Sequence, residues 1–238
     1  MSLWNVEGYV RLRRGGDDRI LELFAERHVP PGARVLEAGC GPGRAAAALA
    51  GRHAAEVTAV DVSPEMLAAA REIVSGSVEL VQADAADLPF ADDSFDAALS
   101  NFAVHLFDRP RAFAEIRRVL RPGAPYWIKT ADPDRIGEHW SAPLFPSFVE
   151  IEVERFPGET ELRHQLEGAG FGEVTAERIT IHEELPREVA IERLRGGTFS
   201  TLALLPAKER EEGVSRAPEL LTDPVVDRST ILVVTARA

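Results

Sequence analysis

Short apolar segments typical of strands alternate with helical segments along residues 34–129, and this alternation limits the possible folds more than any other feature of the chain. The expected strands are 34–38, 56–60, 78–82, 95–99 and 124–129, and the expected helices between them are 44–51, 63–73 and 111–120. A chain that alternates in this way forms a parallel sheet with helices on both faces, joined by right-handed crossovers. The sequence therefore predicts an α/β fold.

The alternation ends after Thr130, where the composition changes. The segment 132–157 is rich in proline and aromatic residues. The elements expected beyond it are a helix capped by Thr160 and ending at Gly168, a strand at 173–181, an amphipathic helical stretch at 185–221 broken at 196–197 and at 206, and a last strand at 230–235. We expect 132–157 and 185–221 to lie together above the sheet as a lid.

A glycine-rich turn follows the first expected strand, and residues 35–43 read Val-Leu-Glu-Ala-Gly-Cys-Gly-Pro-Gly. Glycine at such a turn lets the backbone approach a ligand, and ligands of parallel sheets bind at the carboxyl ends of the strands, where the strand order reverses. Arg44 stands where a dinucleotide fingerprint has its third glycine, and Glu37 would repel a pyrophosphate. The turn therefore favours a ligand with an amino or sulfonium cation.

Two aspartates follow the next two strands. Asp61 comes directly after 56–60, where a carboxylate accepts hydrogen bonds from ribose hydroxyls. The alternative is that Asp61 caps the helix that begins after Ser63. Asp84 follows 78–82 and either accepts a hydrogen bond from an exocyclic amine or lies in a solvated turn. With the glycine turn, these positions predict a nucleoside-binding site.

These segments, with Phe-Asp-Ala-Ala-Leu-Ser at 95–100 and Ile-Arg-Arg-Val-Leu-Arg-Pro-Gly at 116–123, resemble the class I S-adenosylmethionine-dependent methyltransferases, in particular the small-molecule branch that includes ubiquinone/menaquinone-biosynthesis-like enzymes. The resemblance covers about residues 30–130. It implies a Rossmann-like, doubly wound sheet of seven strands, mostly parallel with the last strand antiparallel, which fits the strand at 230–235. It also implies one methyltransferase domain over 1–238. In that domain about 30–130 bind the cofactor, and about 131–229 form an acceptor-side insert and lid over the carboxyl ends of the strands.

The same resemblance implies which residues bind S-adenosylmethionine and the product S-adenosylhomocysteine. Glu37 would hold the methionine amino group, directly or through water, and Asp61 would bind the ribose hydroxyls. The others are Gly39 and Gly41 along the methionine, Val62 and Met66 beside the adenine, Asp84 at the adenine amine with Ala85 offering a backbone N–H, and Asn101 and Phe102 beside the transferring methyl group.

The acceptor is less constrained. Enzymes that methylate a nucleobase amine carry Asn/Asp-Pro-Pro-aromatic where this chain reads Asn-Phe-Ala-Val at 101–104, which argues against that reaction. Residues 131–229 match no specific family, so the acceptor and the atom methylated, O, N or C, stay open. If the acceptor is a hydroxyl or an acidic carbon, a base is required within hydrogen-bond reach. His105, after the fourth strand, is the catalytic candidate; the alternative is that it packs in its loop and caps a helix.

A few other side chains have two interpretations each. Tyr9 either closes over the cofactor or only packs. The aromatic residues Trp140, Phe145, Phe148 and Phe199 either line an apolar acceptor pocket or form core. Cys40, the single cysteine, is expected to be a packing residue and not a nucleophile.

Charge and composition bound the partners. The formal net charge of −12 disfavours nucleic acid, so we expect a small-molecule acceptor. A single cysteine forms no internal disulfide, and no apolar run reaches the roughly 18 residues of a membrane helix, so we expect a cytoplasmic protein without a membrane segment. The acidic run at 92–96 is expected to be a solvated turn, and no metal site is predicted. The oligomeric state has no sequence signal.

Three alternatives stand beside a small-molecule methyltransferase. A nucleotide-dependent oxidoreductase would need the glycine that Arg44 replaces. A non-catalytic S-adenosylmethionine-binding protein on the same fold would differ only in the absence of turnover. A methyltransferase acting on a protein would share every cofactor motif, and the acidic charge argues against one acting on RNA.

Overall fold

The computed structural model describes residues 18–197 and 200–238. The chain forms two compact units. The described residues of the first, the sheet unit, are 18–130, 159–177 and 232–238. Those of the second, the insert unit, are 131–158 and 178–231 apart from 198–199.

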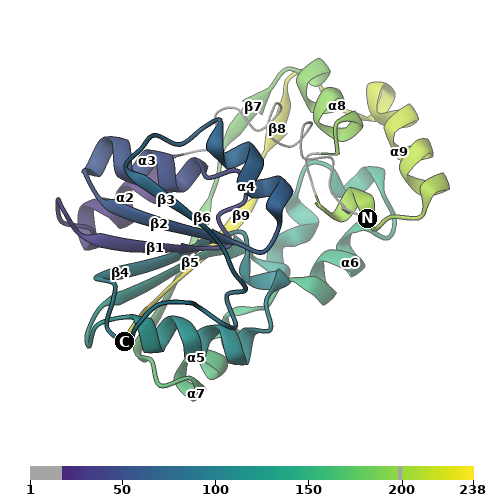
Figure 1. Ribbon diagram of the computed structural model, residues 1–238. Helices are drawn as coiled ribbons and strands as arrows, with labels where there is room; N and C mark the ends of the chain where they lie inside the picture. Colours follow the sequence, from purple (N-terminus) through teal and green to yellow (C-terminus); the bar gives the residue numbers. More distant parts are fainter. Residues whose placement is uncertain (1–17, 198–199) are drawn as a thin grey trace. The chain divides into compact units, whose positions relative to one another are not determined.

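A seven-stranded sheet, in the order β3-β2-β1-β4-β5-β9-β6, carries the sheet unit (Figure 1). Its strands are β1 (Arg34–Ala38), β2 (Glu56–Asp61), β3 (Val78–Gln82), β4 (Ala97–Asn101), β5 (Pro125–Ala131), β6 (Gly172–Thr180) and β9 (Thr230–Arg237). Neighbours among β1 to β5 pair in parallel. The strand order reverses beside β1, because β2 and β3 lie on one side of it and β4 and β5 on the other.

The last strand, β9, is antiparallel to β5. The Gly123 N–H donates to the carbonyl of Ala238 at 2.7 Å, and the Ala238 N–H donates to the carbonyl of Ala124 at 2.9 Å. The end of β9 therefore lies beside the start of β5. The predicted seven-stranded sheet, mostly parallel with an antiparallel last strand, is confirmed.

Helices cover both faces of this sheet (Figure 1). One face carries α2 (Asp18–His28), α3 (Arg44–His53) and α4 (Pro64–Arg71), and the other carries α5 (Arg109–Val119) and α7 (Glu159–Gly168). Successive residues of a strand point to opposite faces. Trp127 of β5 accordingly stacks on Phe24 of α2 at 4.9 Å between ring centroids, whereas Tyr126 meets Phe113 of α5 at 5.9 Å.

The insert unit consists of short helices and a small two-stranded sheet. Its elements are η2 (Pro133–Glu138), η3 (Ala142–Leu144), α6 (Phe148–Arg155), β7 (Glu183–Leu185), α8 (Arg187–Arg195), η4 (Ser200–Ala203), α9 (Ala207–Leu220) and β8 (Val225–Asp227). The β7 and β8 strands pair antiparallel. The Arg155 guanidinium donates to the hydroxyls of Ser200 at 2.9 Å and Thr201 at 2.6 Å, which ties α6 to η4.

Several expected boundaries were wrong. The fourth strand is 97–101 and not 95–99, because Phe95 bridges to Leu120 and the Asp96 carboxylate accepts from the Arg34 N–H at 2.9 Å. Thr160 is not a cap, since α7 already begins at Glu159. The β7–β8 pair and α6 were not expected at all. The placement of 131–229 as a lid over the strand ends, and the single domain over 1–238, stay predictions.

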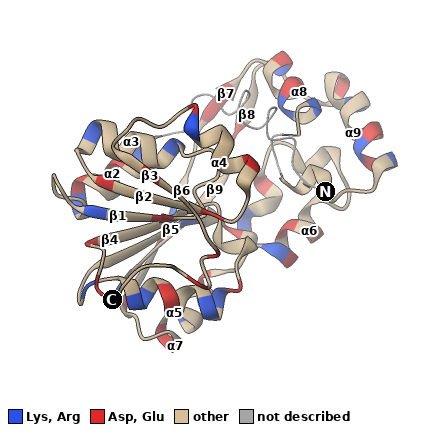
Figure 2. Cartoon of the chain, viewed as in Figure 1, with Lys and Arg blue, Asp and Glu red and all other residues tan. Residues whose placement is uncertain are grey.

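Charged side chains lie mostly on the helices and loops, and the central strands carry few (Figure 2). Among the described residues the buried charged side chains are Glu37, Lys129, Asp132 and Glu152. Burial of a charge is costly unless it is paired or neutralised. In the insert unit Asp132 pairs with Arg178 at 2.7 Å, and Glu152 lies 3.4 Å from Arg155. Glu37 and Lys129 belong to the sheet unit, at the site described below.

No helix in the described part of the chain is long and apolar enough to cross a membrane.

Candidate functional site

The predicted site residues of the sheet unit gather at the carboxyl ends of β1 to β4, around the point where the strand order reverses. In open α/β sheets this is where ligands bind, because the loops on either side of the reversal diverge and leave a crevice.

The turn after β1 is built on glycines with left-handed backbone. Gly39 has φ +74°, and a Cβ there would lie 2.4 Å from the Cβ of Ala103. Gly41 has φ +52°, and a Cβ there would meet no atom of the described residues within 4 Å. Gly39 is therefore required by packing, and Gly41 leaves open space above the turn. The N–H groups of Gly39 and Cys40 donate to the carbonyl of Val60, at 2.8 and 2.9 Å, which fixes the turn to the end of β2.

Asp61 holds two of these loops together. Its Oδ2 accepts from the Gly41 N–H at 2.8 Å, and its Oδ1 accepts from the Ser63 N–H at 2.9 Å. Ser63 in turn caps α4 by accepting from the Met66 N–H at 3.2 Å. The alternative that Asp61 caps the helix is therefore wrong, because Ser63 is the cap and Asp61 instead braces the loops after β1 and β2. This brace does not exclude the ribose interaction, because each carboxylate oxygen has a second lone pair.

The Glu37 carboxyl is buried, which disfavours its ionised form. It is 1% exposed, and burial raises its pKa to about 8. The negative charge of Asp61 raises this pKa further, and a hydrogen bond from the Ala46 N–H opposes both effects. Glu37 Oε2 is buried without a hydrogen-bond partner among the described residues. Buried polar atoms are almost always paired, so this oxygen is open to a donor from water or from a ligand.

The ends of β2 and β3 present a partly apolar surface. Val62 is 67% exposed although it is apolar, whereas Met66 is buried. Asp84 Oδ1 accepts from the Ala86 N–H at 2.9 Å, so Asp84 shapes a turn, as its alternative interpretation required. The Ala85 side chain belongs to the hydrophobic core.

The end of β4 carries the remaining predicted residues. Phe102 has φ +52°, and its N–H donates to the carbonyl of Lys129 at 2.7 Å. Asn101 Oδ1 is buried without a hydrogen-bond partner in the described part of the chain. His105 follows on η1 (Val104–Leu106) and is half-buried. The structure thus places these residues at one strand end, and the catalytic role of His105 stays a prediction.

Lys129 lies buried beside these residues, and its burial was not predicted from the sequence. It is 8% exposed, and its ammonium lies 5.6 Å from the centroid of the Phe102 ring. A signal was present, because only Lys129 and Lys208 are lysines among the 27 basic residues, but burial at a strand end is not visible in a single sequence.

The other candidates are less informative. Tyr9 and Phe199 lie outside the described residues. Trp140, Phe145 and Phe148 are buried in the insert unit, as core residues are. Burial raises the pKa of the Cys40 thiol, which fits a packing role. Within the described ranges no group of His, Cys, Asp and Glu side chains could hold a metal ion.

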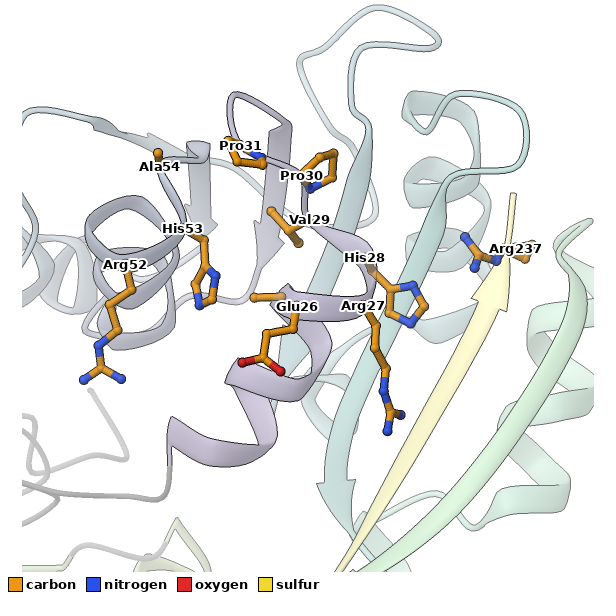
Figure 3. A pocket seen from close by; sticks show the side chains of 11 residues that line it. Glu26, Arg27, His28, Val29, Pro30, Pro31, Arg52, His53, Ala54 and Arg237 are labelled. Carbon is orange, nitrogen blue, oxygen red and sulfur yellow. The ribbon is translucent and has the colours of Figure 1, made fainter.

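A pocket of about 570 Å³ lies at the amino ends of the parallel strands, opposite the candidate site (Figure 3). It is lined by the last turns of α2 and α3, by the segments preceding β1 and β2, and by Arg237 at the end of β9. Arg27 and Arg52 in those last turns are placed favourably for the helix dipoles. Burial lowers the pKa of His28, which favours its neutral form. The pocket shares no residue with the candidate site.

The comparisons with known proteins agree with this geometry. Residues 36–128 match a family model described as a methyltransferase domain. A demethylmenaquinone methyltransferase of Clavibacter sepedonicus is 31% identical over 189 residues, which cover 69% of this chain and 77% of that protein. An O-methyltransferase of Penicillium expansum is 34% identical over 164 residues, 66% of this chain and 58% of that protein.

A solved structure from Anabaena variabilis, described as a candidate methyltransferase of an antibiotic biosynthesis pathway, has the same fold. Its TM-score is 0.74 at 23% identity, covering 94% of this chain and 98% of that one. The matches span from 41% to 77% of the curated relatives' own length, about half in most cases. The resemblance read from the sequence is confirmed: this chain belongs to the class I S-adenosylmethionine-dependent methyltransferases.

Proposed function

We propose that the protein transfers a methyl group from S-adenosylmethionine to a small-molecule acceptor. The observation that carries the proposal is the buried Glu37 carboxyl, whose Oε2 has no partner in the described part of the chain, beside a glycine turn that leaves room for a ligand. A buried carboxyl with a free oxygen suits a cationic amino group, which a dinucleotide lacks at that position. Family membership supports the same cofactor.

The residues present fit the parts of that cofactor. Glu37 would accept from the methionine ammonium, with Gly39 and Gly41 along the methionine. Asp61 would accept from the ribose hydroxyls through its second lone pairs. The remaining assignments are Val62 and Met66 beside the adenine, Asp84 as the acceptor for the adenine amine with the Ala85 N–H as a separate donor, and Asn101 and Phe102 beside the transferring methyl group.

Most of the acceleration would come from placement. When bound, S-adenosylmethionine supplies a methyl group on a sulfonium sulfur, which a nucleophile of the acceptor displaces in line. The protein's part is to hold the acceptor in that line and to keep water out, and good orientation alone lowers a barrier by about 7–11 kcal/mol at most. His105 would accept the proton where the acceptor is a hydroxyl or an acidic carbon.

We assign acceptor choice to residues of about 131–229. The support is that the family model ends at residue 128, so this region is where the chain departs from the shared domain. Small-molecule acceptors are supported by the names of the relatives, which include O-methyltransferases and a demethylmenaquinone methyltransferase.

The charge of −12 supports the exclusion of nucleic acid as an acceptor. A cytoplasmic location rests on the single cysteine.

The direct test is turnover. The purified protein is incubated with methyl-labelled S-adenosylmethionine and a panel of small acids, phenols and amines, and label transfer and S-adenosylhomocysteine are measured. We expect label in a small molecule, and its loss in His105→Ala if that acceptor needs a base. Cofactor binding without transfer to any panel compound, together with label in a protein from a cell extract, would replace the small-molecule acceptor by a protein.

A further inference from the structure

Three polar side chains stand side by side on one face of the sheet, on the adjacent strands β1, β4 and β5. Glu37 is level with Leu99, and Asn101 is level with Lys129. In-register residues of parallel neighbours point to the same face, and so do residues two apart on one strand. Glu37, Asn101 and Lys129 therefore share the face that α2 and α3 cover, which agrees with the hydrogen bond from Ala46 of α3 to Glu37.

The order of these groups across the face is acid, amide, base. Glu37 Oε2 and Asn101 Oδ1 are both buried acceptors without a partner among the described residues. Lys129 follows on the next strand, with its ammonium beside the Phe102 ring. The two ends of the row lie about 10 Å apart sideways, two strand spacings, and about 7 Å apart along the strands. The lysine side chain is long enough to close much of that gap.

This row is complementary to an amino-acid zwitterion. An α-amino acid carries its ammonium and its carboxylate on the same carbon atom, so a ligand that places the ammonium against Glu37 presents its carboxylate within a few ångströms. A carboxylate that points toward β5 would meet the Lys129 ammonium. A second acceptor for the ammonium, Asn101 Oδ1, lies between the two.

We propose that Lys129 binds the carboxylate of the methionine moiety of S-adenosylmethionine and S-adenosylhomocysteine, while Asn101 Oδ1 shares the methionine ammonium with Glu37. The proposal rests on the proposed function, since it assumes that cofactor. It makes Lys129 a cofactor-binding residue that selects for the intact amino-acid group.

The test uses binding and needs no acceptor. Calorimetric titration compares S-adenosylhomocysteine with an analogue in which the homocysteine is replaced by 3-aminopropanethiol, which keeps the ammonium and lacks the carboxylate. The variants are Lys129→Met, which keeps the length of the side chain without its charge, and Lys129→Arg, which restores the charge. Lys208→Met is the matched control, because Lys208 is exposed on α9.

We expect Lys129→Met to weaken S-adenosylhomocysteine binding about 10- to 100-fold, the value of one charge-assisted hydrogen bond, and to leave the analogue unchanged. Lys129→Arg should recover part of the loss, and Lys208→Met should bind both ligands as the parent does. Equal binding of S-adenosylhomocysteine by Lys129→Met and the parent would overturn the proposal, and so would an equal loss for both ligands, which indicates a packing role. A parent protein that binds neither ligand would instead refute the proposed function.

Discussion

At the scale of single residues, Glu37 is the group in which burial, charge and ligand binding are coupled. Its carboxyl is favoured in the neutral form in the free protein, because burial and the charge of Asp61 raise its pKa to about 8. A cationic ligand favours the ionised form. Binding of the methionine ammonium should therefore release a proton from Glu37 below that pKa.

The affinity for S-adenosylhomocysteine should accordingly rise with pH. Below about pH 8 only the ionised fraction of Glu37 is ready to bind, so the dissociation constant should fall by up to about tenfold per pH unit and level off above the pKa. Calorimetric titration between about pH 6.5 and 8.5 measures this. Glu37→Gln should bind weakly with a flat profile, and a parent profile as flat as that of the variant would contradict the assignment.

Glu37 should also lower the free energy of unfolding at alkaline pH. A carboxyl whose pKa is about 8 folded and near 4.5 unfolded binds more protons in the folded state, so the free energy of unfolding falls as pH rises from about 4.5 through 8. Glu37→Gln keeps an acceptor for the Ala46 N–H and has no charge. Without ligand, the melting temperature of this variant should exceed that of the parent at about pH 8 and approach it at about pH 5. Each kcal/mol regained in the free energy of unfolding should raise it by about 2–4 °C. A variant less stable than the parent at both pH values would show that Glu37 is not strained by burial.

At the scale of elements, the loops after β1 and β2 are linked through one side chain. Asp61 accepts from Gly41 and from Ser63, so it orders the glycine turn and the start of α4 before any ligand arrives. Such pre-ordering reduces the entropy cost of binding. Stability and affinity should therefore depend on Asp61 together.

Asp61→Ala should lower both quantities. Two backbone N–H groups lose their acceptor, which should cost about 1–3 kcal/mol in urea unfolding, and S-adenosylmethionine should bind more weakly by about 1.5–3 kcal/mol per lost charge-assisted bond at most. The control is Ser63→Ala, which removes only the cap of α4 and should cost about 1 kcal/mol of stability with little effect on affinity. Unchanged affinity in Asp61→Ala would refute the ribose assignment, and unchanged stability would refute the brace.

Helix packing in the insert unit yields a separate prediction. Gly213 of α9 lies against Phe145, and a Cβ there would come within 2.2 Å of the Phe145 ring, which is fully buried. Alanine gains about 1 kcal/mol of helix propensity over glycine, but overpacking costs about 1–3 kcal/mol. Gly213→Ala should therefore destabilise the protein in urea unfolding. Gly51→Ala, at a helical glycine with open space, is the matched control and should be neutral or stabilising. A stabilised Gly213→Ala would contradict this packing.

Elements with a local signal were predictable. The β1 to β3 strands and the cap of α4 follow from apolar runs and from Ser63-Pro64, and the structure places them within one residue of expectation. The β7–β8 pair was not predictable, because its three-residue strands lie about 40 residues apart and pair only through the tertiary fold. The shift of β4 arose because Asp96 bonds to Arg34 of another strand. Lys129 was missed because burial at a strand end depends on the helices that cover it.

At the scale of the whole molecule, the chain combines a shared domain with a region of its own. Residues 36–128 match the family model and contain every predicted cofactor residue and His105. Much of what lies beyond forms the insert unit, whose buried aromatic residues and Arg155 network give it a core of its own. We therefore expect exchange of residues within 131–229 to change the acceptor and to leave cofactor affinity unchanged.

The central claim is that the glycine turn, Glu37 and Asp61 bind S-adenosylmethionine. Calorimetric titration of the purified protein with S-adenosylmethionine and S-adenosylhomocysteine, with NADPH as the control, tests it most directly. The account predicts binding of the first two in the micromolar range and none of the dinucleotide. Binding of NADPH instead, or of none of the three, would contradict it, because the turn and the two carboxylates would then serve another ligand or none.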